Sequence, residues 1–198
     1  MYYIIKFLFA PLVKFLWLGR FEGYENIPKE KSFIIVANHK SYLDFILLFC
    51  AIPRKISFLA AEVFFKSWFW KPIMLMTGQI KIDRKSNDKT ETFLKVDKLF
   101  LKGGVLGLFP EGTRSRDGKM HKGYTGVIKF SRKYNVPILP IGIKGTFDVL
   151  PPHRKIPRLV KCDLKVGNIY IPGLQSEDLE TRILMQKIAG LAEEVYEY

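Results

Sequence analysis

Short apolar runs alternate with amphipathic segments along this 198-residue chain, and this alternation constrains its fold more than any other feature. Runs of roughly four to eight apolar residues favour buried strands, whereas apolar residues that recur every three or four positions favour helices. The patterns predict strands at 33–37, 57–60, 78–82, 105–109, 137–143 and 161–166, and helices at 42–51, 90–101, 124–134 and 177–198. Strands that alternate with helices predict an α/β fold, with a mostly parallel central sheet flanked by helices.

The composition narrows the class of protein and of partner. Hydrophobic residues make up 48% of the chain and aromatic residues 14%, which argues against disorder. The formal net charge of +13 favours an anionic partner: nucleic acid, an anionic membrane surface or a phosphorylated substrate. The two cysteines, Cys50 and Cys162, are too few for a disulfide framework or a cysteine-based zinc site.

The first 18 residues are apolar apart from Lys6, Pro11 and Lys14. A membrane-spanning helix needs roughly 20 largely apolar residues, so an interfacial helix fits better. Lys6 and Lys14 lie about 80° apart around a helix, which predicts that both reach lipid headgroups while aromatic side chains enter the acyl boundary. Pro11 is expected to kink or divide the segment. We therefore expect a membrane-attaching segment at 1–20 and an α/β domain at 21–198; the alternative is a helix buried in the core.

A second candidate membrane surface is the stretch 64–71, which mixes large aromatic side chains with lysines. Tryptophan beside lysine suits a membrane interface. Core packing and stacking on single-stranded nucleic acid are the alternatives. No RNA-recognition, KH or zinc-finger signature accompanies the stretch, so no nucleic-acid partner is expected.

A histidine and an aspartate, His39 and Asp44, follow the predicted strand at 33–37. With His39 in the turn and Asp44 in the first helical turn, the carboxylate is positioned to fix the imidazole tautomer and stabilise its cation. The alternative interpretation is that Ser41 and Asp44 only cap the helix that follows. No serine or cysteine in an evident nucleophile setting accompanies the pair, which favours direct deprotonation of a substrate hydroxyl.

A candidate anion-binding loop, 109–115, follows the predicted strand at 105–109. Gly112 permits a tight backbone course, and Arg114 offers a planar fork for phosphate. Glu111 is positioned either to hydrogen-bond a substrate hydroxyl or to orient Arg114; the alternative is a solvated turn. Sites in parallel sheets gather beyond the carboxyl ends of strands, so His39, Arg84 and Glu111 are expected on one rim. Dinucleotide-binding and Walker motifs are absent, and no metal site is expected.

Four blocks in order resemble the lysophosphatidate acyltransferase (1-acylglycerol-3-phosphate O-acyltransferase) family of the bacterial PlsC type. Residues 38–44 resemble its His-x4-Asp block and 78–84 its Gly-x-x-x-Ile-Asp-Arg block. Residues 109–115 match Phe-Pro-Glu-Gly-Thr-Arg-Ser, and 136–140 match Val-Pro-Ile-x-Pro. The matched region spans roughly 21–143.

The resemblance implies transfer of a fatty acyl group from acyl-CoA or acyl-carrier protein, as co-substrate, to the sn-2 hydroxyl of 1-acylglycerol-3-phosphate, with no cofactor. It implies His39 as general base and Asp44 as its orienting partner. The acceptor and its phosphate would be bound by five residues: Arg84, Glu111, Gly112, Thr113 and Arg114. It also implies the glycerolipid acyltransferase fold and attachment to anionic phospholipids at the cytoplasmic face of the inner membrane.

One departure bears on the acceptor. Many members of this family carry a lysine in the segment where this chain has Ala60 and Ala61. If that lysine holds phosphate, Lys66 or Lys81 is the candidate substitute. Another lysophospholipid or glycerol-3-phosphate thus stays open as acceptor, as do acyl-chain length, donor carrier and oligomeric state. The rival functions are a non-enzymatic binder of anionic membranes and a metal-dependent phosphohydrolase using His39, Asp44 and Glu111.

Overall fold

A seven-stranded sheet organises the computed structural model, which describes residues 1–83, 88 and 90–198. The strand order is β1-β7-β6-β2-β5-β3-β4, and all neighbouring strands are parallel except β6 and β7. The strands are β1 Leu18–Glu22, β2 Phe33–Ala37, β3 Ile56–Ala61, β4 Ile80–Ile82, β5 Val105–Leu108, β6 Ile138–Lys144 and β7 Cys162–Val166. The predicted mostly parallel α/β sheet is confirmed.

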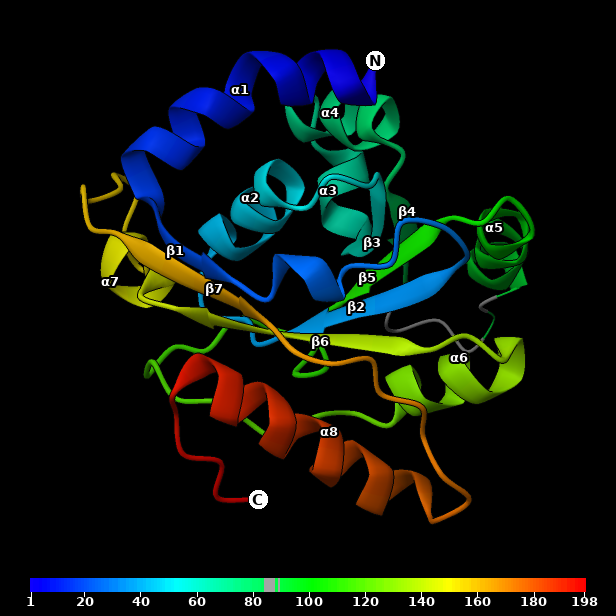
Figure 1. The fold of residues 1–198 in the computed structure, drawn as a ribbon. Helices are drawn as coiled ribbons and strands as arrows, with labels where there is room; N and C mark the ends of the chain where they lie inside the picture. Colours follow the sequence, from blue (N-terminus) through cyan, green and yellow to red (C-terminus); the bar gives the residue numbers. More distant parts are fainter. Residues whose placement is uncertain (84–87, 89) are drawn as a thin grey trace.

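Helices cover both faces of this sheet (Figure 1). Helices α1 to α4 lie over one face, α6 and α8 lie over the other, and α5 flanks the edge near β4. The helices are α1 Tyr2–Trp17, α2 Tyr42–Ala51, α3 Glu62–Lys66, α4 Trp70–Thr77, α5 Thr90–Leu101, α6 Gly126–Tyr134, α7 Thr146–Val149 and α8 Glu177–Ala192, with a short 3-10 turn, η1, at Tyr24–Asn26.

The central strand β2 divides the hydrophobic core into two clusters. Phe33 and Ile35 face the layer of α1 and α2, whereas Ile34 and Val36 face the layer of α6 and α8. All five β2 residues are fully buried, which explains why the sequence shows a continuous apolar run there rather than an alternating one. The C-terminal ends of β2 and its parallel neighbour β5 therefore open on the same rim.

Three predicted elements, β2, α2 and α5, have the bounds that the sequence indicated. The closing helix was predicted to reach Tyr198, and this was wrong, because α8 ends at Ala192. Glu193 adopts the left-handed conformation, with φ of 56°, and turns the last residues back toward the β2 rim. There Glu194 forms an ion pair with Lys40. If the helix continued, it would carry Glu194 away from Lys40.

Helix α1 runs unbroken through Pro11 and bends over α2 (Figure 1), so the proline does not divide it. It buries only Tyr2, Ala10 and Val13. Its large exposed side chains are Met1, Tyr3, Ile4, Phe7, Leu8, Phe9, Leu12 and Phe15. The alternative of a helix enclosed by the core is therefore wrong for this helix. Within the described residues, no helix has the length and apolarity needed to cross a bilayer.

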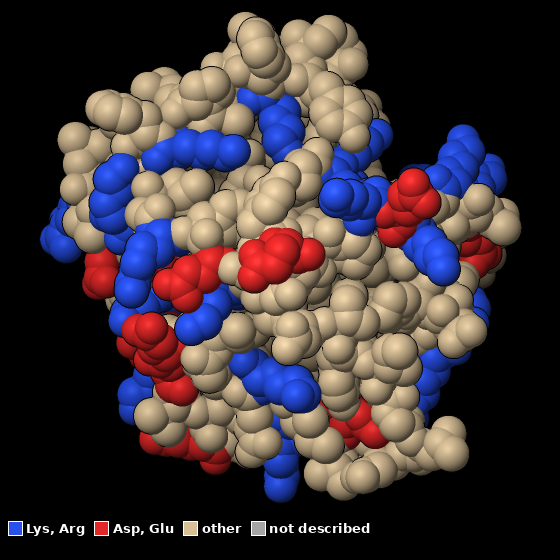
Figure 2. Space-filling model, viewed as in Figure 1, with Lys and Arg blue, Asp and Glu red and all other residues tan. Residues whose placement is uncertain are grey.

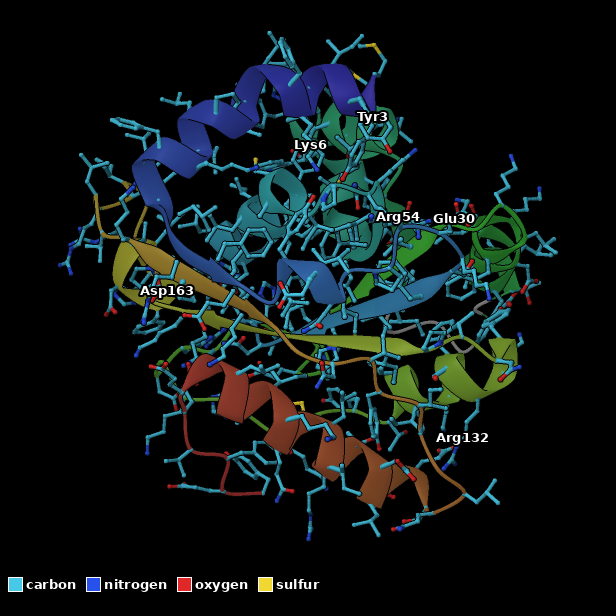
Figure 3. The ribbon with its side chains drawn as sticks, viewed as in Figure 1. Tyr3, Lys6, Glu30, Arg54, Arg132 and Asp163 are labelled. Atoms are coloured by element: carbon cyan, nitrogen blue, oxygen red, sulfur yellow. The ribbon has the colours of Figure 1, made fainter. Side chains whose placement is uncertain are left out.

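The prediction that Lys6 reaches lipid headgroups was wrong. Its side chain points from α1 toward α2, and its ammonium donates a hydrogen bond to the carbonyl of Ile52, the C-cap of α2 (Figure 3). Burial lowers the pKa of Lys6 to about 8. A cation at a helix C-terminus is favourable because the last carbonyls lack partners within the helix. Lys14 is exposed, whereas Lys6 is partly buried.

Candidate functional site

The turn between β2 and α2 is fixed by polar contacts on both sides. The Asn38 side chain donates to the carbonyl of Ile143 at 2.8 Å and accepts from the Ile143 N–H at 2.8 Å, which ties the end of β2 to β6. Ser41 caps α2 by accepting from the Leu43 N–H at 3.0 Å, and its hydroxyl donates to the Leu150 carbonyl at 2.7 Å. The backbone that carries His39 is therefore held from two directions.

Asp44 acts as both a helix cap and a partner of the histidine. Its buried Oδ2 lies 2.9 Å from Nδ1 of His39 and accepts the N–H groups of Lys40 and Ser41 at 2.6 and 2.8 Å. A single carboxylate oxygen of Asp44 thus both caps helix α2 and orients the His39 ring. A carboxylate on Nδ1 favours the tautomer with the proton on Nδ1, which leaves the Nε2 lone pair to accept a proton.

The imidazole ring of His39 is packed as well as hydrogen-bonded. It stacks on Phe109, with ring centroids 4.0 Å apart and planes 14° apart, and Phe109 in turn stacks on Phe58. The His39 side chain keeps 17% of its surface exposed, whereas that of Asp44 keeps 1%. The pair therefore has a buried carboxylate beneath a partly accessible base.

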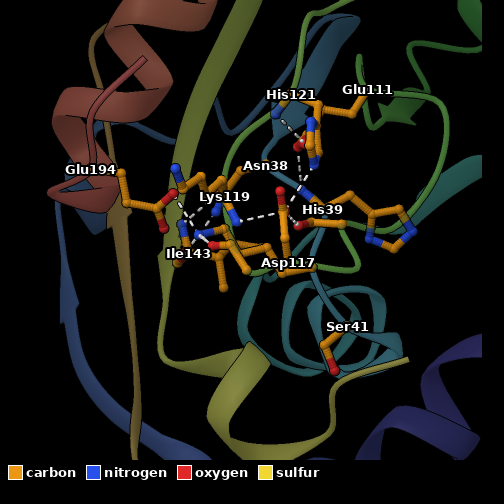
Figure 4. Close-up of polar contacts among 12 residues, drawn as sticks. Asn38, His39, Ser41, Glu111, Asp117, Lys119, His121, Ile143 and Glu194 are labelled. Carbon is orange, nitrogen blue, oxygen red and sulfur yellow. Dashed lines mark hydrogen bonds and ion pairs between the residues drawn. The ribbon is translucent and has the colours of Figure 1, made fainter. Parts of the chain in front are cut away.

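Glu111 joins this turn to the loop after β5 (Figure 4). One carboxylate oxygen accepts the N–H of His39 at 2.8 Å, and the other accepts the N–H of His121 at 2.9 Å. Both oxygens thus have backbone partners, in place of the contact with Arg114 that the sequence suggested. Burial raises the pKa of Glu111 to about 7, against the lowering effect of the two backbone hydrogen bonds.

The predicted anion-binding loop turns sharply at Gly112, whose φ of 70° favours glycine. Thr113 is exposed. The guanidinium carbon of Arg114 lies 3.5 Å from the ring centroid of Tyr42, so the planar group stacks on the first residue of α2. Among the described residues, Nη1 of Arg114 is buried without a hydrogen-bond partner. Arg84 lies outside the described residues.

The remaining contacts of the rim were missed by sequence reasoning. Lys40 pairs with Glu194 at 2.5 Å, and burial raises the pKa of Glu194. His121 has its ring Nε2 2.9 Å from the Asp117 carboxylate, which also accepts from the Ser115 hydroxyl. Tyr42 carries no chemical signal in the sequence, because only the fold places it against Arg114.

Lys66 and Lys81, the candidate substitutes for the family lysine that this chain lacks, each lie beside acidic side chains. Lys66 lies 2.9 Å from Glu62, and Lys81 lies 3.7 Å from both Glu62 and Glu91. Within the described residues, no group of three or more histidine, cysteine, aspartate or glutamate side chains is arranged to hold a metal ion.

A protein-family model described as Acyltransferase matches residues 19–144, which is more than half of the chain and includes the His39–Asp44 pair and the loop at 109–115. The chain belongs to the acyltransferase family. It is 30% identical over 136 residues to the 1-acyl-sn-glycerol-3-phosphate acyltransferase of Borreliella burgdorferi, covering 66% of this chain and 54% of that protein. It is 34% identical over 150 residues to an acyltransferase of the same description from Chlamydomonas reinhardtii, covering 72% and 42%. The chain thus spans about half the length of these curated relatives.

A solved structure shares the whole fold of this family member. The structure of the 1-acyl-sn-glycerophosphate (LPA) acyltransferase PlsC from Thermotoga maritima superposes with a TM-score of 0.82 at 26% identity. The match covers 100% of this chain and 81% of that one. It therefore includes α1 and the C-terminal helix, which lie beyond the family model's limits.

Proposed function

We propose that this chain transfers a fatty acyl group from an acyl thioester to the free sn-2 hydroxyl of 1-acylglycerol-3-phosphate, giving phosphatidate. The observation that carries the proposal is the His39–Asp44 pair, in which Nδ1 faces a buried carboxylate while the ring stays partly exposed on the rim. Membership of the acyltransferase family and the likeness to PlsC support the reaction class.

In the proposed mechanism His39 is the general base. Nε2 takes the proton of the acceptor hydroxyl while that oxygen attacks the thioester carbonyl carbon. The tetrahedral intermediate then collapses with cleavage of the carbon–sulfur bond, and the imidazolium returns the proton to the departing thiolate. Asp44 holds the ring and stabilises its cation throughout. The products are phosphatidate and a free thiol, and no external oxidant or metal enters the balance.

Arg114 is the proposed anchor for the acceptor phosphate, with Arg84 assigned to the same role from its sequence block alone. Stacking on Tyr42 occupies a face of the guanidinium and leaves its in-plane N–H groups, including the unpartnered Nη1, for oxygen acceptors. Gly112 and Thr113 shape the same loop, and Glu111 fixes it to the backbone of His39.

The proposed location is the cytoplasmic face of the inner membrane, with the chain attached to anionic phospholipids. The exposed apolar side chains of α1 support attachment to a membrane. Those near α3 and α4 add Val63, Trp68, Phe69, Trp70, Leu75 and Met76. Figure 2 shows uncharged side chains over the top of the molecule, where α1 and α4 lie, with basic side chains gathered below them.

The test is acyl transfer from labelled acyl-CoA, and in parallel from acyl-carrier protein, to a panel of acceptors in detergent micelles. The panel holds 1-acylglycerol-3-phosphate, other lysophospholipids and glycerol-3-phosphate, each with and without a chelator. Chelator-resistant transfer to 1-acylglycerol-3-phosphate is the expected result. Preferential transfer to another acceptor would replace the proposed substrate, and chelator-sensitive phosphate release without transfer would favour a phosphohydrolase.

A further inference from the structure

Resting on the proposed membrane location, we propose that residues 153–161 form a second membrane contact beside α1 that selects for anionic lipid headgroups. This segment, which we call the basic strap, reads His-Arg-Lys-Ile-Pro-Arg-Leu-Val-Lys and contains no acidic residue. It lies outside the residues matched by the family model. The proposal adds a headgroup-selective surface to the apolar face of α1.

The exposure of the strap is the first observation. Ile156 is 77% exposed, Leu159 is 75% exposed and Val160 is 40% exposed, although nothing in their chemistry favours contact with water. The cations around them, Arg154, Lys155, Arg158 and Lys161, are exposed as well. Apolar side chains interleaved with cations suit the headgroup boundary, where apolar groups enter the acyl region and cations meet phosphates.

Its charges are not neutralised by the protein. Within the described residues no ion pair joins any of the four strap cations to a carboxylate, and the nearby Asp163 pairs with Arg20 at 2.8 Å. The strap therefore keeps its positive charge for an external partner. An anionic bilayer supplies both complements at once, since it offers negative headgroups and an apolar layer beneath them.

The strap is also fixed in place beside α1. The Trp17 indole N–H donates to the Arg158 carbonyl at 2.9 Å, and the Arg158 N–H donates to the Val149 carbonyl at 2.9 Å. The Lys161 ammonium donates to the carbonyls of Phe15 and Leu18 at 2.5 and 3.3 Å, where α1 ends. A segment held this way reaches a membrane together with α1 rather than as a free tail.

The two surfaces are continuous. The Lys161 ammonium lies 5.8 Å from the ring centroid of Phe15, which is 78% exposed on α1. In Figure 1 the gold strap lies beside the C-terminal end of α1 at the left edge of the molecule. Figure 2 shows basic side chains along the same edge. A bilayer that contacts Phe15 is therefore within reach of the strap.

The experiment measures partition of the full chain onto sedimented vesicles of phosphatidylcholine alone or with phosphatidylglycerol. The strap variants are the double substitutions Arg154→Gln/Lys155→Gln and Ile156→Ser/Leu159→Ser. Their matched controls are Arg182→Gln/Lys187→Gln on exposed positions of α8 and Ile171→Ser/Leu174→Ser, exposed residues between β7 and α8. Urea midpoints equal to wild type establish that each variant is folded.

The charge variant should lower partition roughly 30-fold on anionic vesicles, because each cation near such a surface contributes about a factor of five, and should change little on neutral ones. The apolar variant should lower partition about a hundredfold on both vesicles, since each aliphatic side chain contributes about 1.5 kcal/mol or more when buried. The controls should bind like wild type. Strap variants that bind like their controls would overturn the proposal.

A second readout separates this proposal from the proposed function. Transfer between short-chain substrates that stay monomeric in solution should be unchanged in both strap variants. If wild type transfers no acyl group in any assay, the proposed function fails while the partition result still decides the strap. If the strap variants lose transfer from acyl-carrier protein in solution and keep vesicle binding, the strap is a docking surface for the acidic carrier instead.

Discussion

Most polar side chains on the rim around His39 have partners within the protein, whereas the apolar side chains on the outer face of α1 are left exposed. On the rim, one oxygen of Asp44 has three N–H partners and both oxygens of Glu111 have backbone partners. On α1, Phe7 and Phe15 are 79% and 78% exposed, and no other part of the described chain covers them. Most polar groups of the rim have partners within the protein, although within the described residues Asp44 Oδ1 and Arg114 Nη1 are buried without a hydrogen-bond partner. The apolar α1 face, in contrast, can be covered only by an apolar surrounding outside the protein.

This difference implies that the residues that set the reaction chemistry and those that set the membrane location can be changed separately. Contacts inside the rim set the position and tautomer of a base, so changing them should alter turnover. Exposed apolar residues on α1 contribute nothing to the base, so changing them should alter only where the protein resides. A substitution in one region should therefore leave the property set by the other region unchanged.

The largest effect is expected for His39→Ala. Loss of a positioned general base should lower kcat by about 10²–10⁴-fold. The backbone contacts of this residue to Glu111 and Ser115 persist without the ring, so the urea midpoint and vesicle partition should stay near wild type. Turnover close to wild type would remove His39 from the mechanism.

Glu111→Ala should destabilise the fold by several kcal/mol at pH 8. It leaves two part-buried N–H groups, those of His39 and His121, without acceptors, and each costs about 1–3 kcal/mol. Urea unfolding measures the change, and Glu91→Ala, which removes an exposed acid on α5, is the control. A midpoint as high as that of the control would show that Glu111 does not hold the two loops together.

On the α1 side, Phe7→Ser/Phe15→Ser should lower vesicle partition at least about a hundredfold, since burial of each ring in the acyl boundary contributes on the order of 1.5–3 kcal/mol. Leu101→Ser, at the exposed end of α5, is the control. Transfer between monomeric substrates should stay at the wild-type level. A matching fall in that soluble activity would break the separation between the two regions.

Tyr42→Leu should raise the acceptor KM several-fold with little change in kcat. The cation–π contact with Arg114 contributes about 0.5–2 kcal/mol, and its loss lets the guanidinium leave the plane that presents its N–H groups. Tyr42→Phe keeps the ring and should restore the KM. If the phenylalanine variant were as impaired as the leucine variant, the ring face would not be the feature that matters.

The last expected effect is a pH dependence from Glu111. Its folded pKa of about 7 lies above the ordinary value of 4.5, so the folded state binds more protons between these values. The contribution of this group is therefore fully present below pH 4.5 and is lost as pH rises through 7. The stability advantage of wild type over Glu111→Gln should narrow across this range in urea unfolding. A widening gap would reverse the sign.

Local patterns predicted the parts of the molecule that local contacts hold. The bounds of α2 followed from Ser41 and Asp44, and the His39–Asp44 contact spans a single turn. Strand β1 escaped prediction because its five residues carry little apolar pattern and are ordered by pairing with β7.

The sequence patterns could not predict contacts between segments that lie far apart along the chain. Lys40 meets Glu194 only after α8 has crossed the sheet, and Tyr42 meets Arg114 because β2 and β5 are neighbours. The orientation of Lys6 was predicted wrongly for the same reason, since the α2 carbonyl that attracts it comes from another element.

The most direct test of the account measures three proteins side by side: wild type, His39→Ala and Phe7→Ser/Phe15→Ser. Each is assayed for acyl transfer between monomeric substrates and for partition onto anionic vesicles. We expect His39→Ala to lose transfer and keep partition, and the α1 variant to keep transfer and lose partition. A His39→Ala protein that still transfers acyl groups, or two variants that lose both properties together, would contradict this expectation.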